Sequence, residues 1–157
     1  MGKVSGGKRM MISYGSNIST RQMAYRCPDA VPVCAGVLKD YELVFQGRRG
    51  NAHANVIPAE GKQVPIMVWL ISAKDEATLD IYEGVRGGYY RREFVYVETE
   101  HGAMNGLIYV MNPCPYNYPS RAYFDVIEEG YEEFGFPVNV LDEALSVSAR
   151  RMIREGA

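Results

Sequence analysis

The stretch MISYGSN, from Met11 to Asn17, joins a short apolar run to three small residues that favour turns. The apolar run predicts a strand that ends at Tyr14, and the glycine, serine and asparagine predict a turn directly after it. Such a turn has two explanations. It connects a strand with a helix, or it leaves backbone N–H groups uncovered, and uncovered N–H groups bind anions.

The segments next to this stretch predict a strand and a helix. The strand extends back to Lys8, and the spacing of Ser19 and Gln22 is that of a capping box. A short helix is therefore expected to run to about Arg26, where Pro28 stops it.

The middle of the chain is rich in β-branched and aromatic residues. Segment 31–46 predicts a long or bent strand, and segments 51–59 and 63–72 predict two more, separated by the polar turn AEGK. Segment 88–98 alternates as a strand does, and it is joined to segment 104–112 by the hairpin turn TEHGA.

Three helices complete the predicted elements. Ser72 and Asp75 have capping-box spacing for a helix that ends at Gly84, Ser120 caps a helix up to about Phe134, and Asn139 caps the last one. Because the strands cluster in the middle and the two longest helices come last, the sequence predicts an α+β fold.

Composition bounds the kind of protein. The chain has 157 residues, of which 47% are hydrophobic and 23% charged, and residues 10–157 are expected to form a single domain with a buried core. Residues 1–9 resemble a flexible leader or a tag remnant. The net charge of -2 argues against nucleic acid and anionic membranes as partners, and no apolar run approaches the roughly 20 residues of a membrane helix.

The three cysteines are odd in number and widely spread, at Cys27, Cys34 and Cys114. This usage fits reduced thiols rather than a disulfide framework, and it favours a cytoplasmic location.

Three catalytic patterns are absent or incomplete. GKVSGGK has P-loop glycine spacing, but Arg9 stands where a hydroxyl should bind Mg²⁺. His53 and His101 are the only histidines, and no cysteine pair has zinc spacing, so no metal site is expected. Ser16 lacks the nucleophile elbow of a serine hydrolase.

Glu83 is the more informative carboxylate. It stands at the predicted carboxyl end of a helix, where the macrodipole disfavours its ionisation by roughly 0.3–1 kcal/mol. A carboxyl whose pKa is raised toward neutrality can both accept and return a proton. From this segment alone, a solvated residue at a helix end remains the alternative explanation.

Several stretches together resemble the γ-glutamylcyclotransferase-like (AIG2-like) family. These are YGSN, RCPDA, VPIMVWLIS, LDIYEGVRGGYYRR and YVMN followed by YPSRAYFDVIEEGYEEFG, in this order. The resemblance covers the chain from Met11 to about Leu145, and the pairing of YGSN with the downstream YEGV and YY is its most specific part.

The resemblance implies a small mixed β-barrel with flanking helices and a cavity shared by the YGSN loop and the glutamate. Glu83 matches the family's catalytic acid/base. The residues that match substrate-binding positions are Tyr14, Gly15, Ser16, Asn17, Tyr90 and Tyr123. The implied reaction cyclises a γ-glutamyl amide to 5-oxoproline and releases an amine or amino acid. It needs no metal and no cofactor, and its partner is a small γ-glutamyl substrate.

Three functions remain to be separated. The first is a cyclotransferase for γ-glutamyl amino acids or γ-glutamylamines. The second acts on a larger or carrier-linked amine, and the expected discriminator is the width of the pocket mouth, set by PCPYNYP at 113–119 and the last helix. The third is a non-catalytic binding protein. For each function we expect a monomer or a homodimer.

Overall fold

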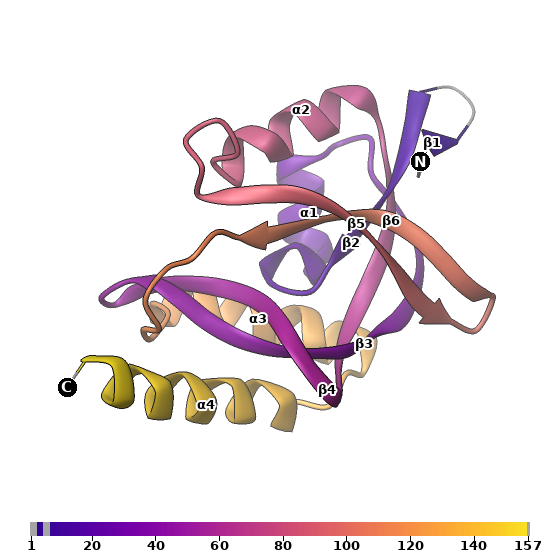
Figure 1. The fold of residues 1–157 in the computed structure, drawn as a ribbon. Helices are drawn as coiled ribbons and strands as arrows, with labels where there is room; N and C mark the ends of the chain where they lie inside the picture. Colours follow the sequence, from indigo (N-terminus) through magenta and orange to yellow (C-terminus); the bar gives the residue numbers. More distant parts are fainter. Residues whose placement is uncertain (1–2, 5–6, 157) are drawn as a thin grey trace.

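The computed structural model describes residues 3–4 and 7–156 and shows an α+β fold (Figure 1). The strands are β1 Lys3–Val4, β2 Lys8–Ser13, β3 Val31–Arg48, β4 Asn51–Ile71, β5 Tyr90–Thr99 and β6 Gly102–Met111. The helices are the 3-10 turn η2 Ser16–Ile18, α1 Thr20–Arg26, α2 Ala73–Tyr82, α3 Arg121–Phe134 and α4 Asn139–Gly156.

Five of these strands close into a barrel. The strand order is β1-β2-β4-β3-β5-β6, and β2 also pairs with β6. This last pairing is parallel, at Met11 and Leu107, whereas the other pairs are antiparallel. The predicted α+β class and small mixed barrel are therefore confirmed.

The β2–β6 contact depends on a glycine. A Cβ at Gly106 would lie 2.8 Å from Ile12 Cδ1 and 3.3 Å from Met10 O. A side chain on β6 at this position would push β2 away, so Gly106 permits the close approach that closes the barrel.

The two strands predicted at 51–59 and 63–72 are one continuous strand, β4. It pairs with β3 on both sides of the expected turn, with a register shift between Lys39 and Tyr41. Asp40 has a φ of 63°, and its carboxylate accepts a hydrogen bond of 3.0 Å from the N–H of Gly61. The polar residues at 59–62 therefore form an irregularity within a long antiparallel pair, because pairing with β3 resumes directly after them.

The predicted helix caps at Ser19, Ser72 and Ser120 are confirmed. Each of these side chains accepts a hydrogen bond from the N–H three residues on, and Asp75 completes a capping box for α2. The cap expected at Asn139 is displaced, because Asn139 already lies in α4, whose first amides bond to carbonyl groups of Pro137 and Val138. In Figure 1, α4 runs alongside β3 and β4, on the opposite side of the strands from α2.

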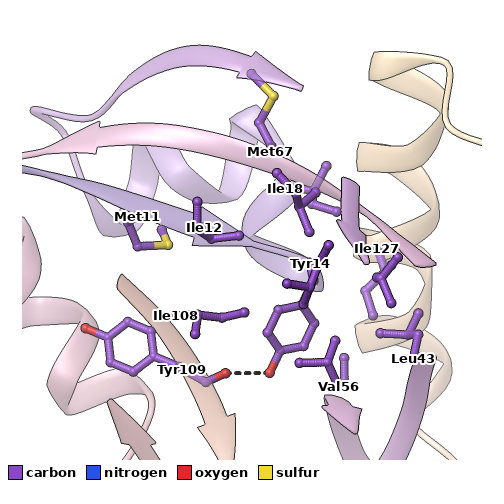
Figure 2. Packing of buried hydrophobic residues seen from close by; sticks show 14 of the residues in the cluster. Met11, Ile12, Tyr14, Ile18, Leu43, Val56, Met67, Ile108, Tyr109 and Ile127 are labelled. Atoms are coloured by element: carbon purple, nitrogen blue, oxygen red, sulfur yellow. Dashed lines mark hydrogen bonds between the residues drawn. The ribbon is translucent and has the colours of Figure 1, made fainter. Parts of the chain in front are cut away.

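The core fills the barrel and the space between the barrel and α3. Figure 2 shows Ile12, Ile18 and Ile127 among its members, and each of these three is at most 1% exposed. Tyr14 reaches into the same core and donates a hydrogen bond of 2.6 Å to the carbonyl oxygen of Tyr109 (Figure 2). This bond ties the end of β2 to β6 and so holds the loop after β2 in place.

β2 begins at Lys8, as the sequence predicts, and Arg9 within it forms an ion pair with Glu76 at 2.7 Å. Of the expected leader, residues 3–4 form β1, which pairs with β2. Residues 1–2 and 5–6 of the expected leader lie outside the described residues. Among the residues the structure describes, no helix is long and apolar enough to cross a membrane.

Candidate active site

A polar pocket of about 120 Å³ opens where β2 ends. Residues 11–17, 53–54, 82–83 and 89–90 line it, together with Arg26, Tyr109 and Tyr123. All seven predicted site residues are therefore brought together, from segments far apart in the sequence. The volume is below the roughly 300–1,000 Å³ of sites for drug-sized ligands, so the pocket suits a smaller molecule.

The loop after β2 lines this pocket and begins the 3-10 turn η2. The first hydrogen bond of η2 runs from the N–H of Ile18 to the carbonyl of Gly15, at 3.1 Å. The N–H groups of Gly15, Ser16 and Asn17 precede it and have no partner within η2. The turn therefore starts a helix, and anion binding by these N–H groups stays a prediction.

A glycine is needed at position 15 because neighbouring side chains lie close to it, and not because its backbone is left-handed. Its φ is -119°, which other residues also adopt. A Cβ at this position would lie 3.1 Å from the Ala54 Cβ and 3.4 Å from the Tyr123 hydroxyl. The glycine therefore keeps open the space between the loop and the opposite wall of the pocket.

Glu83 is the residue that ends α2. Its N–H bonds to the carbonyl of Leu79 at 2.8 Å, and its Oε1 accepts a hydrogen bond of 3.4 Å from Nδ2 of Asn17. The residue as a whole is only partly buried, but burial of its carboxyl group raises the pKa from 4.5 to about 7, against a lowering effect of Arg26. Its position at the negative end of the helix acts in the same direction. Such a carboxyl can exchange protons near neutral pH.

Tyr90 and Tyr123 both form hydrogen bonds with the backbone of Ala54 on β4. The hydroxyl of Tyr90 donates to the carbonyl of Ala54 at 2.6 Å, and the N–H of Ala54 donates to the hydroxyl of Tyr123 at 3.0 Å. Burial raises the pKa of both phenols, so both stay protonated. Tyr90 has thus committed its proton to the backbone, whereas the Tyr123 proton is still available to a bound molecule.

Among the pocket residues that sequence reasoning missed are Arg26, His53, Tyr89 and Tyr109. Nδ1 of His53 lies 2.8 Å from the Tyr89 hydroxyl, and burial lowers the pKa of His53. The Tyr109 hydroxyl donates to Asp80 at 2.7 Å. For Arg26, Tyr89 and Tyr109 a weak signal existed, because RCPDA, LDIYEGVRGGYYRR and YVMN are stretches shared with the family. For His53 none did, since His53 lies outside these stretches and only the folded chain brings it to the pocket.

The expected pocket mouth is corrected by the structure. Neither residues 113–119 nor α4 line the pocket. The 113–119 loop is instead held against the β3–β4 turn, where the N–H of Gly47 bonds to the carbonyl of Pro115 at 2.8 Å and the Asn117 side chain bonds to the carbonyl of Gly47 at 2.7 Å. Arg26, Tyr82 and the YGSN loop are among the residues that line the pocket instead.

The sequence analysis also considered a serine nucleophile and a metal site, and the structure places the residues of both. Oγ of Ser16 accepts a hydrogen bond from the Gln22 side chain, and His53 is directed to Tyr89. His101 lies in the β5–β6 turn beside Glu100. Within residues 3–4 and 7–156, no three His, Cys, Asp or Glu side chains are grouped as a metal site requires.

Comparisons with known proteins agree with this geometry. Residues 63–143 match the model of the AIG2-like family. The gamma-glutamylcyclotransferase of Mus musculus is 30% identical, over 82% of this chain and 72% of the mouse protein. That of Homo sapiens is 27% identical, over 88% and 78%. A solved structure named gamma-glutamyl cyclotransferase superposes with a TM-score of 0.77 at 27% identity, covering 87% of this chain and 86% of that one.

Proposed function

Since this chain belongs to the AIG2-like family, we propose that it is a γ-glutamyl cyclotransferase. The reaction converts a γ-glutamyl amide into 5-oxoproline and a free amine or amino acid. The observation that carries the proposal is that Glu83, with a pKa of about 7, lines the same pocket as the YGSN loop and accepts a hydrogen bond from Asn17 of that loop.

The first step forms the ring. The α-amine of the γ-glutamyl group attacks its own γ-carbonyl carbon, and ionised Glu83 accepts the proton that the amine loses. Because both reacting groups belong to one molecule, a folded pose of the substrate supplies much of the rate as effective molarity. A pocket of about 120 Å³ favours such a compact pose over an extended one.

The second step releases the leaving group. The carbonyl oxygen, which gained negative charge during attack, re-forms its double bond as the bond to the leaving nitrogen breaks. Protonated Glu83 returns its proton to that nitrogen, so the carboxyl ends as it began. The N–H groups of Gly15, Ser16 and Asn17 are suited to hold either the oxyanion or a carboxylate of the substrate.

Tyr123 has a supporting role in this proposal. Its hydroxyl oxygen accepts from the Ala54 N–H, which leaves the hydroxyl proton available to a ligand. A Cβ at Gly15 would lie 3.4 Å from the same oxygen, so the hydroxyl lies near the YGSN loop, and we assign to it a hydrogen bond to the bound γ-glutamyl group.

Release of 5-oxoproline from γ-glutamyl compounds tests the function. Wild type should release it from at least one γ-glutamyl amino acid or amine, and Glu83→Gln should not. Glu132→Gln is the matched control, because Glu132 is exposed on α3. Equal release by the wild type and the Glu83→Gln variant would contradict the acid/base role.

The same assay separates the alternatives. A binding protein would be stabilised against heat by γ-glutamyl compounds but would release no 5-oxoproline. An enzyme for larger amines would turn over a γ-glutamyl group on a peptide faster than one on a single amino acid. In each case the setting that we propose is cytoplasmic, consistent with the free thiols of Cys27, Cys34 and Cys114, and the protein acts as a monomer or homodimer.

A further inference from the structure

Arg26 is the arginine of the pocket, and the proposed mechanism leaves it without a role. It is the last residue of α1 and lines the pocket. Its Nη1 donates a hydrogen bond of 3.1 Å to Oδ1 of Asn17, and its guanidinium carbon lies 4.3 Å from the centroid of the Tyr82 ring. Arg26 therefore sits at the side of the pocket where partly exposed Tyr82 meets solvent.

The guanidinium of Arg26 has unused binding capacity. Among the described residues, no Asp or Glu oxygen lies within 4.0 Å of it, and its recorded hydrogen bond goes to a neutral amide. Arg92, on the neighbouring β5, contrasts with it by pairing with both Glu76 and Asp80. Since a guanidinium carries five N–H donors in a planar fork, several donors of Arg26 remain for a ligand.

Asn17 connects Arg26 with the catalytic carboxyl. Its Oδ1 accepts from Arg26 at 3.1 Å, and its Nδ2 donates to Glu83 at 3.4 Å. These two bonds fix the orientation of the amide, because only its oxygen can accept and only its nitrogen can donate. One side chain thus joins the cation and the carboxyl across the pocket.

We propose that Arg26 binds a carboxylate group of the substrate and that Asn17 couples this contact to Glu83. The inference rests on the proposed cyclotransferase function. A γ-glutamyl amino acid has two carboxylates, one on the glutamyl α-carbon and one on the leaving amino acid. A planar guanidinium matches a carboxylate in bidentate geometry, which makes Arg26 a specificity-determining residue.

Binding at Arg26 changes the behaviour of Glu83. Burial raises the pKa of Glu83 and of Tyr123 on α3 and lowers that of His53 on β4, and the charge of Arg26 acts to lower all three. A bound carboxylate offsets this charge, so the pKa of Glu83 rises when substrate binds. The ionised carboxyl then becomes a stronger base for the proton of the α-amine.

The other titratable groups around Glu83 carry no positive charge that could act on its pKa as Arg26 does. Apart from Tyr82, which precedes Glu83 in the chain, they are Tyr14 directly after β2, Tyr89 and Tyr90 at the start of β5, Tyr109 on β6, Tyr123 on α3 and His53 on β4. Burial raises the pKa of the five phenols, which stay neutral at physiological pH, and burial lowers the pKa of His53. Arg26 is therefore the cation to which the carboxyl responds.

Three matched substrates test the inference. They are γ-glutamyl-alanine, γ-glutamyl-ethylamine, which lacks the carboxylate of the leaving group, and γ-glutamyl-alanine with its glutamyl α-carboxylate amidated. Arg26→Met should lower kcat/KM on γ-glutamyl-alanine by about 10- to 100-fold, the usual loss of a hydrogen bond to a charged group. The analogue on which Arg26→Met costs less than about threefold identifies the carboxylate that Arg26 binds.

Two further variants test whether the loss of activity in Arg26→Met comes from a disturbed fold. Arg26→Lys keeps the charge and should recover part of the activity. Arg21→Met removes an arginine from the same helix at an exposed pair with Glu129, and it should change nothing. In addition, the apparent pKa in the kcat/KM profile should be higher in Arg26→Met than in the wild type, which a mere folding defect would not produce.

Binding measured without turnover separates this inference from the function itself. Calorimetry should show that the Glu83→Gln variant binds γ-glutamyl-alanine. The double variant Glu83→Gln/Arg26→Met should bind it about 10- to 100-fold more weakly. If the wild type releases no 5-oxoproline but binding depends on Arg26, only the proposed function is overturned. Equal losses on all three substrates, or binding that is absent or independent of Arg26, overturn the role of Arg26.

Discussion

Replacing Glu83 by glutamine should stabilise the fold while removing activity. The folded chain raises the pKa of Glu83 from 4.5 to about 7. Keeping this carboxyl ionised in the folded state therefore costs about 3 kcal/mol. Because Glu83 is partly exposed, solvent reduces the cost to roughly 2 kcal/mol. Glutamine has a similar shape and no charge, so it avoids this cost.

The sign of the effect depends on pH. Below about pH 4.5 Glu83 is protonated in both the folded and the unfolded chain, and wild type and variant should be equally stable. Between pH 4.5 and about 7 the unfolded chain releases the proton that the folded chain retains, so the wild type loses stability as pH rises. Above pH 7 the full difference is present, which corresponds to about 4–8 °C in Tm.

Thermal unfolding of the wild type and Glu83→Gln between pH 4.5 and pH 8.5 measures this difference. The same samples should differ in 5-oxoproline release by about 10²–10⁴-fold in kcat. Glu132→Gln is again the control and should show neither change. Parallel Tm curves across the pH range, or a Gln variant that is less stable at pH 8, would refute a buried carboxyl with a raised pKa.

Three further predictions concern the same pocket. The kcat/KM of the wild type should rise with pH up to an apparent pKa of about 7, and a flat profile from pH 5 to pH 8 would contradict this. Gly15→Val should abolish substrate binding because even a Cβ would lie 3.1 Å from Ala54, whereas Ser16→Ala should keep measurable turnover because its N–H survives. An acyl-enzyme mass together with an inactive Ser16→Ala would instead indicate a serine nucleophile. Turnover should survive exhaustive chelation, since intramolecular cyclisation needs no Lewis acid, and rescue by a divalent ion after EDTA would disprove this.

Sequence patterns predicted the parts of the fold that depend on neighbouring residues. The caps at Ser19, Ser72 and Ser120 are bonds between residues three apart, so the spacing alone reveals them. The position of Glu83 at a helix end was predicted for the same reason. The continuity of β4 was not, because the polar residues at 59–62 look like a turn until β3 pairs on both sides of them.

Other features depend on contacts that the sequence does not display. The resemblance indicated that Glu83 and the YGSN loop share a cavity, but it gave no contact between them. Arg26 was missed because its importance comes from lying against Asn17 and Tyr82 without a carboxylate partner in the described chain, which is a property of the folded structure. The mouth was misplaced because the 113–119 loop bonds to Gly47 instead of bordering the pocket.

The closure of the barrel between β2 and β6 also has a kinetic consequence. β3 with β4, and β5 with β6, are neighbours in the sequence, so each pair closes only a short loop and forms early. Met11 pairs with Trp69 and Leu107, which are far along the chain, and these contacts have high contact order. The loop after β2 and the carboxyl after α2 therefore meet late in folding. A partly folded chain that has both hairpins but not this closure holds much of the secondary structure and no catalytic pocket.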